Sequence, residues 1–176
     1  MRSARGQSDP APRPTSRADR PDGHRMNLLL SYGGWESDPW VERIPRLLEP
    51  MGIRSVRATS GKTASEVIRS TPIHVAVVDL GLPLDEGEGV SSEAGPRVLQ
   101  MLTRLSTRPP TLVVKRSRAS REDEAELFAA LRAGAFAVLD RPRGDADLEL
   151  LLDVLRRIMQ RHYAGRWPTP PDPSSS

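Results

Sequence analysis

Residues 73–83 have the sequence IHVAVVDLGLP, and the interpretation of the rest of the chain depends on this stretch. Its first six residues form a nearly unbroken apolar run rich in β-branched side chains, which is typical of a strand buried on both faces in a parallel sheet. Asp79 follows the run directly, and a Gly and a Pro then turn the chain into a loop. Because open α/β sheets bind ligands at the carboxyl ends of their strands, Asp79 is either a functional carboxylate or a residue that caps a turn.

Short apolar runs alternate with helical patterns along the chain. Thr63 and Glu66 have the spacing of a capping box, while Gly52 and Gly134 stand where helices are expected to end. Five βα units with short connections predict an α/β domain with a five-stranded parallel sheet and helices on both faces. The predicted strands are residues 27–31, 53–58, 73–79, 111–115 and 135–139, and the predicted helices are residues 39–51, 63–70, 96–105, 120–133 and 145–162.

The two ends of the chain differ in composition from its middle. Residues 1–25 hold no aliphatic side chain larger than Ala after Met1, so they cannot bury enough apolar surface to become ordered. Residues 165–176 are rich in Pro and Ser. We therefore expect one domain, residues 26–164, between two disordered tails. Met26 directly precedes the first predicted strand, so either Met1 or Met26 is the true start.

Composition excludes several classes of protein. The chain has no cysteine, which excludes disulfide frameworks and thiolate metal sites. No apolar run approaches the roughly 20 residues of a membrane span, and no apolar segment follows the N-terminal arginines as in a signal peptide. We expect a cytoplasmic protein with no membrane partner. The net charge of +3 is too small to favour a nucleic-acid partner.

The sequence SGKT at residues 60–63 invites comparison with a phosphate-binding P-loop. That motif needs a glycine five residues before Gly61, and Val56 stands there. We therefore expect only a loop and a helix start at this position.

Three features together resemble the receiver domain of bacterial two-component response regulators, over about residues 26–162. The sequence VVDLGLP at 77–83 is similar to the phospho-acceptor strand and its loop, and AGAFAVLDRP at 133–142 is similar to the receiver strand that ends in a basic residue before proline. The third feature is the five-fold βα order with a long amphipathic last helix. The resemblance implies a flavodoxin-like fold of strand order 2-1-3-4-5, with Asp79 as the acceptor of a phosphoryl group from a sensor histidine kinase or a phosphotransfer protein.

The sequence departs from the receiver pattern at the end of the first strand. The resemblance implies an acidic pair there that holds Mg²⁺, but Ser31 and Tyr32 occupy those positions. Neither supplies a carboxylate, which Mg²⁺ sites in proteins usually contain, so Mg²⁺ binding is doubtful. One alternative is an unusual metal shell in which Asp85 or Glu86, from the acidic loop after Asp79, supplies the missing ligands.

Basic residues replace other expected groups around Asp79. The resemblance implies a Thr or Ser at the end of the fourth strand, where Lys115 and Arg116 align, and a lysine before proline, where Arg141 stands. Arginine keeps the charge but changes its shape. We expect Lys115, Arg116 or Arg141 to form a direct ion pair with Asp79 that holds the domain in one state without phosphate.

These features predict a stand-alone receiver-like domain that takes part in a phosphorelay through protein–protein contact, with impaired or absent phosphorylation and no enzyme activity. The resemblance implies an output face made by the fourth helix, fifth strand and fifth helix, which would contact a kinase or another signalling protein and through which two copies can pair. The chain after residue 162 is too short for a DNA-binding effector domain. Two alternatives stay open, namely a phosphorylatable receiver with an unusual metal shell and a small α/β enzyme that uses Asp79 at the sheet edge.

Overall fold

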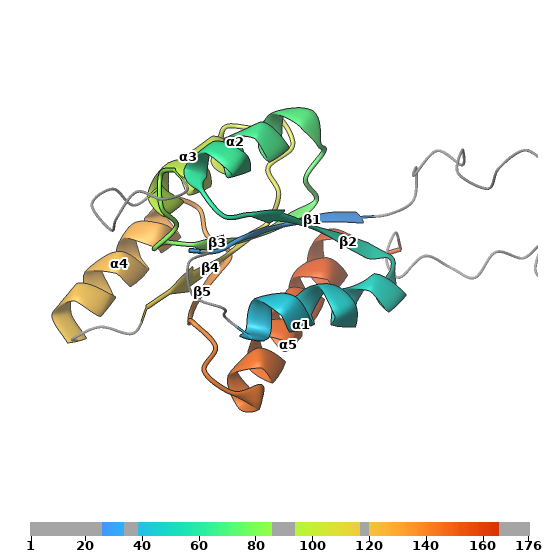
Figure 1. Ribbon diagram of the computed structural model, residues 1–176. Coiled ribbons are helices and arrows are strands. Elements are labelled where there is room, and N and C mark those ends of the chain that lie inside the picture. Colours follow the sequence, from blue (N-terminus) through green and yellow to red (C-terminus); the bar gives the residue numbers. More distant parts are fainter. Residues whose placement is uncertain (1–25, 34–38, 86–93, 117–119, 166–176) are drawn as a thin grey trace, which may run out of the picture.

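A parallel five-stranded sheet in the order β2-β1-β3-β4-β5 forms the middle layer of the computed structural model (Figure 1). The structure describes residues 26–33, 39–85, 94–116 and 120–165, so residues 1–25 and nearly all of the predicted C-terminal tail lie outside the described residues. The predicted flavodoxin-like topology is confirmed. The strands are β1 (Met26–Ser31), β2 (Ile53–Ala58), β3 (Val75–Asp79), β4 (Thr111–Lys115) and β5 (Ala137–Asp140).

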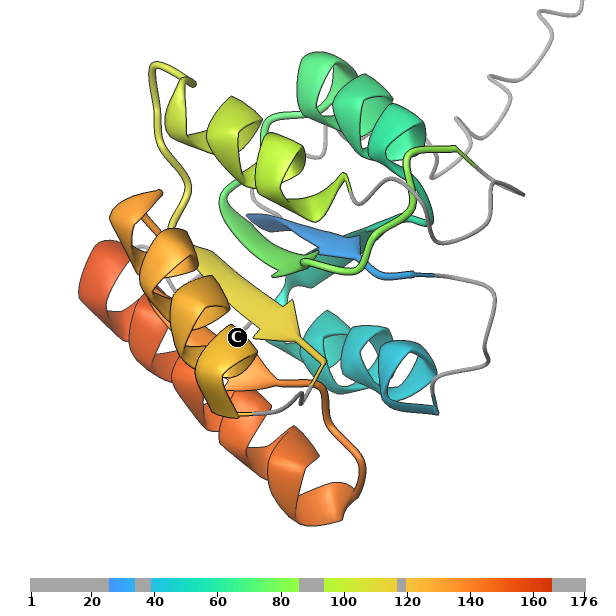
Figure 2. The ribbon, with the colours of Figure 1, turned by 90° about the vertical axis from the view of Figure 1, so that its left-hand side faces the viewer.

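Helices cover both faces of the sheet. Figure 2 shows α2 and α3 on one face and α1 and α5 on the other, and α4 lies at the β5 end of the sheet. A short 3₁₀ turn, η1 (Glu49–Met51), extends α1. No helix of the described residues is both long and apolar enough to cross a membrane. The helices are α1 (Pro39–Leu48), α2 (Gly61–Ser70), α3 (Gly95–Thr103), α4 (Ser120–Arg132) and α5 (Asp145–His162).

Strand residues alternate between two apolar cores, as the side-chain period of two requires. Leu28 and Leu30 of β1 pack with α1 and α5, while Leu29 packs with α2 and α3. Residues of β3 are buried on both faces in the same way, as the apolar run before Asp79 predicted. A smaller cluster, which includes Leu99 of α3, Val113 of β4 and Ala130 of α4, joins α4 to the sheet on the α3 side.

The predicted helix start at Thr63 is wrong by two residues. Ser60 is the N-cap of α2: its hydroxyl accepts the Thr63 N–H at 3.2 Å, and the Thr63 hydroxyl accepts the Ser60 N–H at 2.9 Å. Thr63 therefore completes the capping box at the position predicted for Glu66. The Gly61 and Lys62 amides donate to the carbonyl oxygens of Pro83 and Leu84, so the loop after β3 takes the donors that a P-loop would offer to phosphate.

Other boundaries shift by small amounts. The third strand begins at Val75 and the fifth at Ala137, two residues later than predicted, because parallel pairing with the neighbouring strands begins only there. In α1, Leu47 is 44% exposed, whereas Val41 is buried. Gly134 ends its helix as predicted, with a positive φ of 96°.

The start of α3 lies directly against the backbone that follows β3. A Cβ atom on Gly95 would lie 2.4 Å from the Asp79 carbonyl oxygen and 2.5 Å from the Leu80 Cα atom, so a side chain forces the helix away. We expect Gly95→Ala to lower the free energy of unfolding by about 1–3 kcal/mol in urea titrations. Gly144→Ser is the control, since a Cβ there meets nothing within 4 Å and serine is a better N-cap for α5. Equal losses in the two variants would contradict this packing.

Stability should also fall at mildly acidic pH because of His74. Its Nδ1 atom accepts the Asn27 N–H at 3.0 Å, which requires a neutral ring, and burial lowers the pKa of His74 below its usual 6.5. The unfolded chain therefore binds the proton more readily, so this contribution is present above pH 6.5 and is lost as the pH falls through the folded-state pKa.

Chemical unfolding of His74→Asn between pH 7.5 and 5 measures this effect, since asparagine keeps an acceptor but has no titrating ring. We expect the stability of this variant to fall less steeply with acidification than that of the wild type. The control is His162→Asn, on the exposed end of α5, which should keep the wild-type slope. A wild-type slope in His74→Asn would refute the assignment.

Candidate functional site

Asp79 is the last residue of β3, and its side chain is fully buried, with 0% exposure, at the carboxyl edge of the sheet. Its Oδ1 atom accepts the Gly81 N–H at 2.9 Å, and its Oδ2 atom accepts the Gly33 N–H at 3.4 Å. The two amides come from the loops that follow β3 and β1. Asp79 is thus held by the backbone on two sides, and its buried charge requires a cation nearby.

Arg141 supplies that cation. It directly follows β5, where its N–H donates to the Lys115 carbonyl oxygen at 2.7 Å, and its guanidinium forms an ion pair with Asp79 Oδ2. Only 13% of the Arg141 side chain is exposed. Water therefore screens this pair weakly, and each partner depends on the other to compensate its buried charge.

Lys115 and Arg116 lie in different surroundings. The Lys115 ammonium donates to Asp140 Oδ1 at 2.7 Å, because the parallel register of β4 and β5 places these two residues opposite each other. Arg116 lies beside Gly81: the position of a Cβ there would be 3.5 Å from Arg116 Nε and 3.4 Å from Asp79 Oδ1. Arg116 Nε is buried and finds no hydrogen-bond acceptor among the described residues, so this residue adds positive charge next to Asp79.

The side chains of Ser31 and Tyr32, at the end of β1, have different neighbours. The Ser31 hydroxyl donates to the Val77 carbonyl oxygen at 3.2 Å and accepts the Asp79 N–H at 3.3 Å, so it links β1 to β3 directly below the site. Tyr32 lies on the β2 side, where it contacts Arg57; the pKa of Arg57 is raised mainly by its hydrogen bond to Glu42 and less by Tyr32. Ser31 therefore belongs to the Asp79 site and Tyr32 does not contribute a donor there.

Sequence reasoning missed the two glycines and Asp140. Gly81 was interpreted only as a loop former, and Gly33 was not singled out as a site residue. Both act through backbone N–H groups, which every residue except proline carries, so their residue type indicates no such role. Asp140 lies one position before Arg141 in the strand ending, and its role depends on the strand register.

The described residues do not fit a Mg²⁺ site at Asp79. Mg²⁺ requires oxygen ligands in octahedral geometry, with one or two carboxylates among them. Here Oδ2 of Asp79 faces a guanidinium, the Ser31 hydroxyl is engaged with backbone groups, and Asp140 binds Lys115. Among the described residues no three His, Cys, Asp or Glu side chains gather as metal ligands. Asp85 lines a pocket between α2 and α3 instead, and Glu86 lies outside the described residues.

The comparison of sequences identifies one relative. No family model matches this chain. A protein of Myxococcus xanthus (strain DK1622), protein-glutamate methylesterase/protein-glutamine glutaminase 4, is 32% identical over 125 residues, which cover 66% of this chain and 32% of that protein. The chain therefore spans about a third of the length of this relative.

Solved structures identify the fold. The signal receiver domain of a Luxo repressor protein from Vibrio parahaemolyticus superposes with a TM-score of 0.60 at 15% identity, over 78% of this chain and 92% of that one. A response regulator from Burkholderia pseudomallei, with a phosphorylated aspartic acid, a calcium ion and citrate, superposes with a TM-score of 0.56 at 22% identity, over 74% of this chain and 66% of that one. The chain has the fold of response-regulator receiver domains.

A substitution that breaks the buried Asp79–Arg141 ion pair should destabilise the protein more than one that breaks an exposed ion pair. We expect Arg141→Ala to lower the free energy of unfolding by about 3–5 kcal/mol, because it leaves the Asp79 carboxylate buried without its cation. Arg43→Ala is the matched control: it removes the Arg43–Asp145 ion pair, whose side chains are 52% and 77% exposed, and should cost about 0–1 kcal/mol.

A double-mutant cycle separates the ion pair from other effects of the arginine. Since Asp79→Asn removes the charge that Arg141 compensates, the double variant should be more stable than the sum of the single losses implies. Additive losses in urea titrations would mean that the two side chains do not interact in solution.

Proposed function

We propose that this chain is a receiver-like signalling domain in which the Asp79–Arg141 ion pair takes the place of phosphorylation, so that phosphorylation is impaired or absent. The observation that supports this proposal is the ion pair between the Arg141 guanidinium and Asp79 Oδ2. A carboxylate oxygen must approach phosphorus in line, with the charge of the phosphoryl oxygens neutralised by cations. In this chain a cation is present, but it is already bound to the nucleophile.

The energetics of the site support this proposal. To attack phosphorus through Oδ2, Asp79 would have to release a guanidinium that is itself only 13% exposed, and Oδ1 already accepts the Gly81 N–H. Separating a buried ion pair costs several kcal/mol, because both charges lose their partner. Among the described residues no three metal-ligating side chains gather to hold a metal ion that could offset this cost.

The proposal assigns no enzyme activity to the chain and places it in the cytoplasm as a protein–protein interaction module. We infer that its partner is a sensor histidine kinase or another signalling protein, bound at the face formed by α4, β5 and α5. Phe128 and Leu131 support this choice, since they lie three residues apart on α4 and are 55% and 42% exposed, so that this helix carries exposed apolar surface. Pairing of two copies through the same face belongs to the proposal.

The alternative is a receiver that is phosphorylated at Asp79. The observation in its favour is the phosphorylated aspartic acid in the similar Burkholderia structure. Under this alternative Arg141 must leave Asp79 and contact the phosphoryl group, and ligands from outside the described residues must complete a metal shell.

Beryllofluoride, which imitates an aspartyl phosphate, separates the two functions. With Mg²⁺ and beryllofluoride added, we expect no change in the melting temperature of the wild type and no shift of the Gly33, Gly81 and Arg141 amide resonances. A clear stabilisation with shifts at these amides would establish a phosphorylatable site and overturn the proposal. The control is Asp79→Asn, since any response that survives in this variant does not arise from the carboxylate.

A further inference from the structure

The two helical layers of the domain differ in charge. Helices α1 and α5 together carry five acidic and five basic side chains, and ion pairs such as Arg43–Asp145 join some of them. Helices α2 and α3, with the residue that directly follows α3, carry four basic side chains and one acidic side chain, Glu66. The face of the sheet that α2 and α3 cover therefore has a net positive charge. The four basic residues are Lys62, Arg69, Arg97 and Arg104.

The four basic residues form two pairs along the junction of α2 and α3, which lie side by side (Figure 1). Arg69 follows Lys62 by seven residues, and Arg104 follows Arg97 by seven. Residues seven apart lie on the same face of a helix, about 10 Å apart along its axis. Because both helices connect parallel strands, they run in the same direction. One pair, Lys62 and Arg97, therefore lies at the helix starts, and the other pair lies at the helix ends.

The charge of these residues is not neutralised within the domain. All four are exposed, and none of them is paired with an acidic side chain in the part of the chain that the structure describes. Basic side chains gathered without acidic neighbours produce a positive potential that attracts an anionic partner.

A pocket of about 370 Å³ lies between α2 and α3, among these cations. The Ser65 hydroxyl donates to Met101 Sδ at 3.4 Å across the junction, which joins the two walls. For comparison, an apolar cavity of about 150 Å³ is large enough to bind benzene, so this pocket has room for an apolar side chain. Its apolar lining comes from Leu84, Ala94, Val98 and Met101, and its charged lining from Lys62, Asp85 and Arg97.

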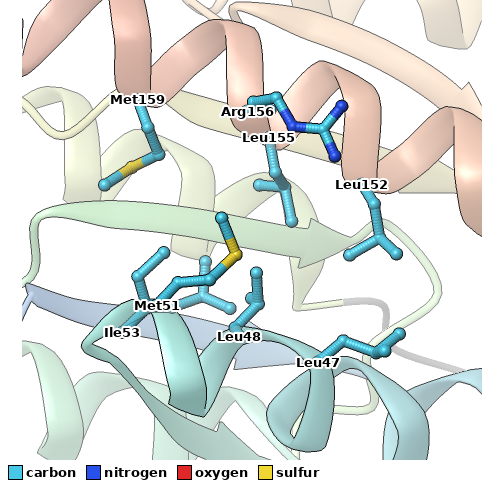
Figure 3. Close-up of a pocket in the computed structure, with 9 residues that line it drawn as sticks. Leu47, Leu48, Met51, Ile53, Leu152, Leu155, Arg156 and Met159 are labelled. Atoms are coloured by element: carbon cyan, nitrogen blue, oxygen red, sulfur yellow. The ribbon is translucent and has the colours of Figure 1, made fainter. Parts of the chain in front are cut away.

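A pocket on the opposite face of the sheet lacks this combination (Figure 3). It lies between α1 and α5, and its volume is about 180 Å³. Arg156 is the one charged residue of its lining, and the Arg156 guanidinium already pairs with Asp153 Oδ1 at 2.6 Å. The pocket between α2 and α3 instead has two cations without such a partner, Lys62 and Arg97.

We propose that the face formed by α2 and α3 binds an acidic segment of a partner protein. The apolar side chain of this segment enters the pocket, and its carboxylates contact the Lys62–Arg97 pair on one side and the Arg69–Arg104 pair on the other. The roughly 10 Å between the pairs corresponds to three residues of extended chain at about 3.3 Å per residue. The segment should therefore carry acidic residues three positions apart with an apolar residue between them. This proposal does not depend on the ionic state of Asp79.

Other anionic partners use features that this face does not have. Single-stranded nucleic acid stacks its bases on aromatic side chains, and α2 and α3 contain none. Membrane surfaces bind helices that expose bulky apolar side chains. In the described ranges the large apolar side chains that are exposed lie on α1, α4 and α5, and none lies on α2 or α3. An acidic protein segment uses both the charge and the pocket.

Titration of the ¹⁵N-labelled full chain with the peptide acetyl-Glu-Glu-Leu-Glu-Glu-amide tests the proposal. We expect saturable shifts of the α2 and α3 amide resonances, while those of α1 and α5 stay in place. The affinity should fall roughly ten-fold when NaCl is raised from about 50 to about 300 mM, because salt screens exposed charges. Titrations without shifts in α2 and α3 at low salt would overturn the proposal.

Charge reversal on the protein provides the second arm. The double variant Lys62→Glu with Arg97→Glu should bind the peptide roughly ten-fold more weakly than the wild type, because like charges then face each other. The matched control is Arg157→Glu with Arg161→Glu, which changes the net charge equally but lies on α5. The control should bind as the wild type does, and the amide spectra report that both variants are folded. Equal weakening in the two variants would show attraction by net charge alone and would overturn the proposal.

Changes in the ligand identify the occupant. A peptide with Gly in place of Leu keeps the charge but cannot fill the pocket, so we expect it to bind several-fold more weakly. Equal binding of the two peptides would mean that the pocket takes no part. Titrations with a single-stranded oligothymidine and with phosphatidylserine vesicles complete the comparison. Tighter binding of either one, with shifts in α2 and α3, would assign this face to nucleic acid or to a membrane and would overturn the proposal.

Discussion

A negative charge buried at the end of a strand constrains everything around it. Asp79 is fully buried, so its carboxylate must be compensated within the protein, and two backbone amides together with the Arg141 guanidinium compensate it. The arginine in turn can reach Asp79 only if β5 pairs with β4 in the observed register and ends at Asp140. The order of the strands, the exit of β5 and the ionic state of the site therefore depend on one another.

Much of the fold could be predicted because apolar periodicity alone determines which face a segment buries. The apolar run before Asp79 is buried on both sides. The predicted amphipathic pattern of the last helix agrees with the buried residues of α5, which are Leu148, Leu151, Leu155, Ile158 and Met159. Helix ends were harder, because they depend on hydrogen bonds to distant backbone. Ser60 and not Thr63 caps α2, and the carbonyl oxygens that hold the first turn of that helix come from Pro83 and Leu84, more than twenty residues later.

The candidate site was predictable to the extent that side-chain charge defines it. Asp79 and Arg141 stood out because a carboxylate ends a buried strand and a guanidinium precedes a proline on another. Which cation binds the carboxylate was not predictable, since Lys115 is as close to the site in the topology as Arg141. The register of β5 places Asp140 opposite Lys115 and so decides the pairing. Tyr32, which was also predicted near the site, interacts with Arg57 of β2.

Backbone hydrogen bonds attach the loop after β3 to the start of α2. The Gly61 and Lys62 amides bind the Pro83 and Leu84 carbonyl oxygens, and Leu82 is bonded to both Asp79 and Ala94 through its backbone. Displacing this loop would remove hydrogen-bond acceptors from the first turn of α2, so the loop is firmly held on the α2 side of the site. On the other side, Asp79 is held by its ion pair with Arg141, which lies on the connection from β5 to α5. Loss of the ion pair would therefore free Arg141 and the connection to α5, while the hydrogen bonds to α2 would still hold the loop after β3.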